Sequence, residues 1–303
     1  MVKHSDNELM NLIKCNRQEL EMFKRVQKGA LKEAQKIKKH FFNKEIRILG
    51  VSGATRRNDD CPRHDSHTDW LLEKAMEHCR KLGAKTETIK LWDCNIQPCK
   101  GCYSTTNAQC HYKCSCYPEG SEAEDEMTSK IYDKLMRADA IIFATPTHNF
   151  KVSSPMSLFI DRCISMDGSL SPANPNAAKD PVLNRKHTKF IELTADSKTF
   201  GSGFLRRFTG KTAGIIATGH EVGLSMAITS LFMTLNHFGM AFPPFSNMYA
   251  TGDYCQGLYT DDKMLRNECH AQDAVKLAEN VFSMAKAMKQ DPKTWWKYEG
   301  GSN

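Results

Sequence analysis

The sequence predicts an α/β fold: a doubly wound, five-stranded parallel sheet preceded by an N-terminal helical extension. Three observations predict it. Residues 46–52, 140–145 and 212–218 are short apolar runs rich in β-branched residues, which is typical of strands buried on both faces. A segment with helical periodicity follows each run, so strands and helices alternate. The composition, with 40% apolar and 25% charged residues, is that of a globular chain and excludes a largely disordered one.

The elements follow in order along the chain. Apolar residues recur at helical spacing through residues 7–41, which predicts one or two amphipathic helices that dock on the body or on another subunit. Ser66 is expected to cap a helix, because Asp69 and an apolar helix face follow it. The remaining elements are strands at 46–52, 86–91, 140–145, 212–218 and 245–250, and helices at 125–138, 153–163, 222–239 and 261–289.

The chain divides into an extension (1–44), a body (45–290) and a C-terminal tail (291–303). Two segments interrupt the alternation within the body. Residues 93–124 form a Cys-rich loop, and residues 167–210 form an insertion that opens with Pro, Asn, Gly and Ser. Because the insertion follows a helix and precedes a core strand, we expect it near the carboxyl ends of the strands, where it could form a lid.

The charge of the chain is concentrated at its N-terminus. Residues 1–47 hold 12 Lys and Arg against 6 Asp and Glu, whereas the whole chain has a formal charge of +7. A basic segment can attract nucleic acid, but a body that is almost neutral gives no such indication. We therefore expect a solvated helix face and no nucleic-acid partner.

Residues 222–252 lack charged side chains, yet the pair Pro243–Pro244 interrupts them, which favours a helix packed on the sheet over a membrane span. The chain starts without an apolar stretch, so no secretory signal is expected. In that setting twelve cysteines favour free thiols or metal ligands over disulfides. We therefore expect a cytoplasmic protein without a membrane partner.

The loop after the first strand has the composition of a phosphate site. Ser52–Arg56 supplies hydroxyls, backbone N–H groups and a guanidinium, and the helix that follows begins with Ser66 and Thr68. A phosphate is stabilised by such groups and by the positive end of a helix. An ordinary capped turn accounts for the same residues, so both interpretations stay open on this loop alone.

Two further polar loops follow the third and fourth core strands. With them, the segments SGATR (52–56), SHT (66–68), PTHNFKVS (146–153), IDR (160–162) and TGHEVG (218–223) together resemble the NADPH-dependent FMN reductase family, including its iron–sulfur flavoprotein relatives. The resemblance covers residues 46–239 and implies a flavodoxin-like fold. It departs from the family at His148, which replaces an aromatic residue, at Lys151 near a usual glycine, and in a phosphate loop lengthened by residues 59–65.

The resemblance implies non-covalent FMN. The residues implied for its phosphate are Ser52, Ala54, Thr55, Arg56, Ser66 and Thr68. Those implied for its ring are Pro146, Thr147, His148, Asn149, Phe150, Val152, Thr218, Gly219, His220 and Gly223. His148 is the candidate catalytic residue, for orienting a substrate; anchoring of the backbone is the alternative for His148 and His220.

The Cys-rich loop contains five closely spaced candidate metal ligands, Cys99, Cys102, Cys110, Cys114 and Cys116. Iron–sulfur relatives carry a compact cluster motif at this place, but here Thr105 stands where the third cysteine belongs. The thiols suffice for a [4Fe–4S] cluster or for zinc, and the spacing fits neither pattern cleanly. A cluster, zinc and structural thiols therefore stay open.

The function that the resemblance implies is an FMN-dependent NAD(P)H oxidoreductase. Hydride would pass from the nicotinamide through FMN to a small oxidant such as a quinone, nitro or azo compound. The alternatives are an iron–sulfur flavoprotein in ferredoxin-linked electron transfer and a zinc-dependent nucleic-acid-binding module. We also expect a homodimer or homotetramer in which residues 7–41 form the contact and residues 167–210 partly cover a flavin.

Overall fold

The computed structural model describes residues 4–40, 44–59, 65–196, 198–252 and 266–291. At its centre lies a parallel sheet in the order β2-β1-β3-β7-β8. This order confirms the predicted five-stranded, doubly wound, flavodoxin-like sheet. The strands are β1 (Arg47–Ser52), β2 (Lys85–Lys90), β3 (Ala140–His148), β7 (Thr212–Gly219) and β8 (Asn247–Thr251).

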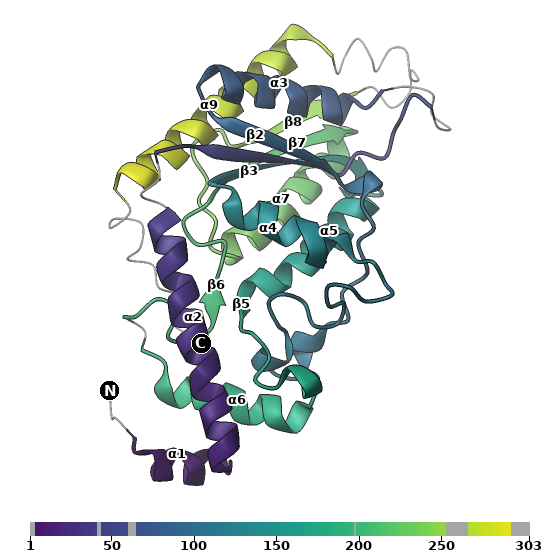
Figure 1. The fold of residues 1–303 in the computed structure, drawn as a ribbon. Helices are drawn as coiled ribbons and strands as arrows, with labels where there is room; N and C mark the ends of the chain where they lie inside the picture. The colour runs from purple at the N-terminus through teal and green to yellow at the C-terminus, as the bar shows by residue number, and fades with distance from the viewer. Residues whose placement is uncertain (1–3, 41–43, 60–64, 197, 253–265, 292–303) are drawn as a thin grey trace.

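Helices cover both faces of the sheet (Figure 1), and the side chains of the three central strands, β1, β3 and β7, alternate between two apolar cores. On one face lie α3 (His67–Lys81) and α9 (Glu268–Gln290), which pack against Ile48, Ile142 and Ile216. The other face, which includes Val51, Phe143 and Ile215, lies under α4 (Tyr132–Arg137), α5 (Ser154–Cys163) and α7 (Glu221–His237).

The N-terminal extension forms the two expected helices, α1 (Asp6–Ile13) and α2 (Arg17–His40). Their apolar residues pack against the insertion of the same chain, which contains β5 (Asp167–Ser169), α6 (Pro181–Thr194) and β6 (Leu205–Arg206). The shared core includes Leu20 and Phe23 of α2 and Phe190 of α6, all fully buried. The expectation that these helices dock on the body is therefore confirmed. The expected contact of residues 7–41 with another subunit loses its basis, because their apolar face is already covered.

Several element boundaries differ from the expected ones. We expected strand β3 to end before Pro146, but it continues through Pro146 to His148. Its last residues pair with a short strand, β4 (Lys151–Val152). Strand β1 ends opposite Ala144, so Pro146 lies beyond its paired residues, and on the other side Pro146 lies opposite Thr218 of β7. Strand β8 begins only at Asn247, because Phe245 has a φ of 51°.

The expected helix 125–138 opens with a π-helical turn, Met127–Ile131, before α4. Helix α9 begins at Glu268, after its cap Asn267; residues 261–265 of the expected helix lie outside the described residues. Short 3₁₀ turns lie at Leu91–Asp93, Cys102–Ser104, Asn107–Gln109, Ile164–Met166 and Pro175–Ala177. Among the described helices, none is long and apolar enough to span a membrane.

Candidate functional site

Three loops meet at the carboxyl edge of the sheet, because β1, β3 and β7 are parallel neighbours. Two hydrogen bonds join them. The Ser153 hydroxyl donates to the Gly53 carbonyl oxygen at 2.6 Å, which links the loop after β3 to the loop after β1. The hydroxyls of Thr68 and Thr218 lie 2.6 Å apart, which links the start of α3 to the end of β7. The predicted convergence of the three loops is therefore present.

Glycines allow these loops to approach closely. A Cβ at Gly53 would lie 2.6 Å from the Ser153 Oγ, and one at Gly223 would lie 2.5 Å from the Thr147 Cγ2. Gly219 has a φ of +147° and faces the same threonine, so a side chain there would be strained as well as crowded. The Thr147 Oγ1 is buried at this junction without a hydrogen-bond partner among the described residues. A buried hydroxyl of this kind is a candidate contact for a ligand.

A two-residue hairpin projects from the end of β3. Asn149 and Phe150 have φ values of 49° and 65°, and they connect His148 to its cross-strand partner Lys151. A positive φ is unusual for a phenylalanine, and the Phe150 side chain is 58% exposed at the tip. Val152, in contrast, is buried. Backbone strain combined with an exposed aromatic ring indicates a functional position.

Serine hydroxyls of the predicted phosphate loop form hydrogen bonds within the loop and to the start of α3. The Ser66 Oγ accepts the Asp69 N–H and caps α3, which confirms the expected cap. The Ser52 hydroxyl donates to the Asp69 carboxylate and accepts the Ala54 N–H at 3.2 Å. These groups therefore hold the loop in shape. Among the described residues Arg56 forms no ion pair with a carboxylate, whereas its neighbour Arg57 pairs with Asp93, so the Arg56 guanidinium is available to an anion.

The two histidines of the predicted ring site lie on different elements. His148 is exposed on the hairpin, and its pKa is lowered by partial desolvation and by the nearby Arg56 guanidinium. A neutral imidazole is therefore favoured near pH 7, and it can both donate and accept a hydrogen bond. His220 occupies the N-cap position of α7, although its side chain does not cap the helix.

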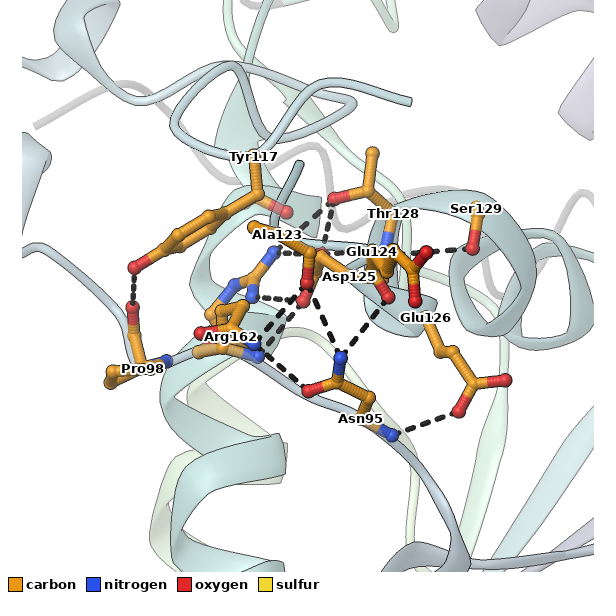
Figure 2. Close-up of polar contacts among 12 residues, drawn as sticks. Asn95, Pro98, Tyr117, Ala123, Glu124, Asp125, Glu126, Thr128, Ser129 and Arg162 are labelled. Carbon is orange, nitrogen blue, oxygen red and sulfur yellow. Dashed lines mark hydrogen bonds and ion pairs between the residues drawn. The ribbon is translucent and has the colours of Figure 1, made fainter. Parts of the chain in front are cut away.

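An ion pair fastens both ends of the Cys-rich loop (Figure 2). Arg162, at the end of α5, donates to the Gln97 carbonyl oxygen at 2.7 Å and pairs with both carboxylate oxygens of Asp125 at 2.8 Å. Both side chains are 1% exposed, and the Tyr117 ring lies 4.9 Å from the guanidinium. Sequence reasoning missed this role. Two signals were available in the sequence. Asp125 is an acidic residue directly after the loop, and Arg162 lies at the end of the helix that follows β3.

The sulfur atoms of the loop lie close to one another. Cys102 and Cys116 have their Sγ atoms 3.1 Å apart, and the hydrogen bond with Cys116 lowers the pKa of Cys114. Burial raises the pKa of Cys110 to about 12. Cys99 accepts a hydrogen bond from the Gly101 N–H at 3.4 Å. Cysteine sulfur is a common ligand of both iron and zinc. However, no three His, Cys, Asp or Glu side chains in the described ranges are arranged as metal ligands.

The insertion contacts the Cys-rich loop, and its expected role as a partial cover over a flavin stays a prediction. Thr188 of α6 bonds the Thr106 hydroxyl at 2.7 Å, and Asn184 donates to the Gln109 side chain at 2.8 Å. A cavity of about 680 Å³ opens between α5, α7 and the Cys-rich loop, and its lining includes Val152 but no residue of 167–210. The insertion lies away from this cavity because its apolar residues are buried against α1 and α2.

Comparisons with known proteins agree with this architecture. The family model of NADPH-dependent FMN reductase matches residues 46–185. An iron–sulfur flavoprotein of Archaeoglobus fulgidus is 30% identical over 117 residues, which are 39% of this chain and 48% of that protein. One of Methanocaldococcus jannaschii is 27% identical over 117 residues, 39% of this chain and 51% of that protein. The chain thus spans about half the length of these curated relatives.

Among solved structures, RosB with a bound intermediate, 8-demethyl-8-formylriboflavin-5'-phosphate, has the same fold. Its TM-score is 0.54 at 18% sequence identity, and the match covers 82% of this chain and 81% of that one. The family match contains the first two of the three converging loops and the whole Cys-rich loop. Residues 46–185 of this chain are therefore similar to the NADPH-dependent FMN reductase family, and iron–sulfur flavoproteins are among the proteins that match this part of the chain.

Proposed function

We propose that this protein is an FMN-dependent oxidoreductase that takes hydride from NAD(P)H and reduces a small oxidant such as a quinone, nitro or azo compound. The convergence of the three loops around the Thr147 hydroxyl, which has no hydrogen-bond partner among the described residues, carries the proposal. The family match over residues 46–185 supports it. Bound FMN would supply the redox chemistry itself, so the chain has to bind, orient and shield its cofactor.

The types of residue at the sheet edge are suited to binding and orienting FMN. The Arg56 guanidinium, Thr55 and the N-terminus of α3 would hold the phosphate, while Ser52, Ser66, Ala54 and Thr68 keep the loop in shape. The Thr147 hydroxyl and the loop from Thr218 to Gly223 would border the flavin ring. Pro146, Asn149, Phe150 and Val152 supply the hairpin next to it. His148 would orient the substrate through a hydrogen bond.

The experiment is a fluorescence titration of the apoprotein with FMN, followed by anaerobic addition of NADPH or NADH to the loaded protein. Stoichiometric binding, then bleaching of the oxidised flavin absorbance, is the expected result. Binding without bleaching by either nucleotide would contradict the choice of electron donor. Absence of FMN binding would contradict the proposal as a whole.

A second candidate function is that of an iron–sulfur flavoprotein, in which the Cys-rich loop is a second redox centre. The 3.1 Å contact between the Cys102 and Cys116 sulfur atoms, inside a loop with five thiols, favours it. The zinc-dependent nucleic-acid module has less support, because the basic helix α2 packs on the insertion and two of the three sheet-edge loops lie within the match to a flavin family. Elemental analysis of anaerobically purified protein separates iron, zinc and neither.

We further propose a homodimer or homotetramer in which α7, and not residues 7–41, forms the contact. Val222, Met226 and Met233 of α7 are each more than half exposed, and residues 222–252 contain no charged side chain. An uncharged apolar face suits a second copy of the same face, because no charge is left unpaired. Light scattering of Met233→Lys, with deletion of residues 1–44 as comparison, tests which surface holds the subunits together.

A further inference from the structure

The cavity between α5, α7 and the Cys-rich loop has a volume of about 680 Å³, which lies within the usual range of small-molecule sites. One of its lining residues, Val152, is the cross-strand partner of Thr147. The buried Thr147 hydroxyl borders the proposed flavin site. A ligand in the cavity would therefore lie next to the strand pair that borders this flavin site.

Apolar and aromatic side chains form much of the cavity wall. Ile160 and Ile164 line it at the end of α5, and Leu231 and Met233 line it from α7. Tyr103 comes from the Cys-rich loop and is about half exposed. An exposed aromatic ring can stack on a flat ligand, and a methionine side chain adapts to its shape. The wall therefore suits a planar, mostly apolar molecule.

A few hydrogen-bonding groups interrupt this apolar wall. The hydroxyls of Ser157 and Ser230 line the cavity, and neither has a hydrogen-bond partner among the described residues. His237, at the end of α7, lines it as well, and its Nε2 lies 3.7 Å from the buried Asp167 carboxylate. Hydroxyl and imidazole groups can donate hydrogen bonds to oxygen atoms of a ligand.

The charge of the lining disfavours an anion. Among the described residues that line the cavity, none is a lysine or an arginine, and Asp161 supplies a carboxylate. Asp161 has no ion-pair partner within the described part of the chain. An anionic ligand would therefore lose water without gaining a cation. The phosphates of FMN and NAD(P)H are for this reason expected outside the cavity, whereas a neutral ligand fits it.

We propose that this cavity binds the oxidant, and that the oxidant is a neutral, planar aromatic compound whose oxygen atoms accept hydrogen bonds, as in a naphthoquinone. The inference rests on the proposed function and narrows its range of oxidants by shape and by charge. Tyr103 and Met233 contact the flat ring, and Ser157, Ser230 and His237 are the candidate donors to its oxygen atoms.

The test uses two ligands of the same shape and different charge. The compound 2,3-dimethyl-1,4-naphthoquinone is neutral, and 2-hydroxy-3-methyl-1,4-naphthoquinone is an anion at neutral pH. Neither has a free position on the quinone ring, so neither adds to a cysteine thiol. Calorimetric titration of the full chain, with oxidised FMN and without nucleotide, measures binding while no reduction takes place. We expect one neutral quinone per chain, and the anion should bind at least about tenfold more weakly.

Two pairs of variants locate the binding site. Tyr103→Ala removes the stacking ring and Tyr103→Phe keeps it. Ser230→Trp fills the cavity from α7, and Thr229→Trp places the same ring at the neighbouring exposed position, which does not line the cavity. The dissociation constant of the neutral quinone should rise roughly 2- to 10-fold in Tyr103→Ala and at least about tenfold in Ser230→Trp. Both controls should stay within about twofold of the parent chain.

Turnover with NADPH or NADH tests whether the bound quinone is the one that is reduced. Its KM should rise in Tyr103→Ala and Ser230→Trp by about the same factors as its dissociation constant. An unchanged KM in a variant with weakened binding would overturn the role of this cavity. Equal binding of the two quinones, or unchanged binding in both Tyr103→Ala and Ser230→Trp, would overturn the inference as well.

A second copy of the chain is the other occupant that the test distinguishes, because Met233 belongs both to the exposed face of α7 and to the cavity. If the neutral quinone binds a monomeric Met233→Lys variant and not the parent oligomer, a second copy fills the cavity and the inference is wrong.

The FMN titration is carried out on the same samples, so the two levels of proposal fail separately. Normal FMN binding and bleaching in a chain that binds neither quinone would overturn the inference alone. Quinone binding in a chain that binds no FMN would overturn the proposed function and leave the cavity as a site for a ligand that the chain does not reduce.

Discussion

The two parts of the site are positioned in different ways. The loops at the sheet edge follow parallel strands directly, and glycines at 53, 219 and 223 bring them into contact. The Cys-rich loop has no strand to hold it. It is fastened by side chains that arrive from distant segments, Arg162 from α5 and Lys179 from the insertion. One site can therefore combine loops that the sheet positions with a loop that a few buried polar contacts position. We expect the sheet-edge loops and the Cys-rich loop to respond differently to mutation.

The largest expected effect is at the anchor of the Cys-rich loop. Asp125→Ala leaves the Arg162 guanidinium buried and unpaired, which costs about 3–5 kcal/mol of unfolding free energy. Urea denaturation measures it, and Asp161→Ala, at an exposed position one residue before Arg162, is the control. Equal stability of both variants would mean that the buried pair does not hold the loop.

A change in pH should destabilise the insertion and the Cys-rich loop, which each hold a buried histidine, before it affects the sheet edge. Burial lowers the pKa values of His187 and His111 to about 4, from the ordinary histidine value of 6.5. The unfolded chain therefore binds more protons than the folded one, and stability falls as pH drops from about 6.5 toward 4. A loss of roughly 2–3 kcal/mol per histidine corresponds to this difference.

His187→Phe should flatten this pH dependence, because the His187 ring stacks on Phe23 with centroids 4.9 Å apart and a phenyl ring fits the same place. Thermal melts between pH 7 and pH 4.5 measure the effect in both proteins. The same slope in His187→Phe as in the parent chain would assign the pH dependence to other groups.

At the sheet edge, Arg56→Ala should weaken FMN binding and leave folding intact. A charge-assisted hydrogen bond to phosphate contributes about 1.5–3 kcal/mol, so the dissociation constant should rise roughly 10- to 100-fold. Fluorescence titration measures it. Unchanged affinity would remove Arg56 from the phosphate site, and equal weakening in Asp125→Ala would erase the distinction between the two parts.

The smallest effect is expected from closing the glycine contact. Gly223→Ala places a methyl group 2.5 Å from the Thr147 Cγ2 and 3.2 Å from the Phe150 Cα, which costs about 1–2 kcal/mol through local repacking. Calorimetric titration with FMN should show weaker binding. Gly29→Ala, on α2 with no atom within 4 Å, is the matched control and should be neutral or slightly stabilising. A loss of affinity in the control would indicate a nonspecific effect.

The sequence by itself determined the sheet, because buried parallel strands such as 140–145 and 212–218 are marked by continuous apolar runs. It also determined the cap at Ser66 and, through strand order, the meeting of the three loops. The tertiary structure decided where the helices of residues 7–41 dock and that the insertion supports the Cys-rich loop. It alone paired Arg162 with Asp125 and brought Lys179 to Cys102. The physical reason is range: periodicity and capping are local properties of neighbouring residues, whereas these contacts join residues 37 and 77 positions apart, for which the sequence carries no spacing rule.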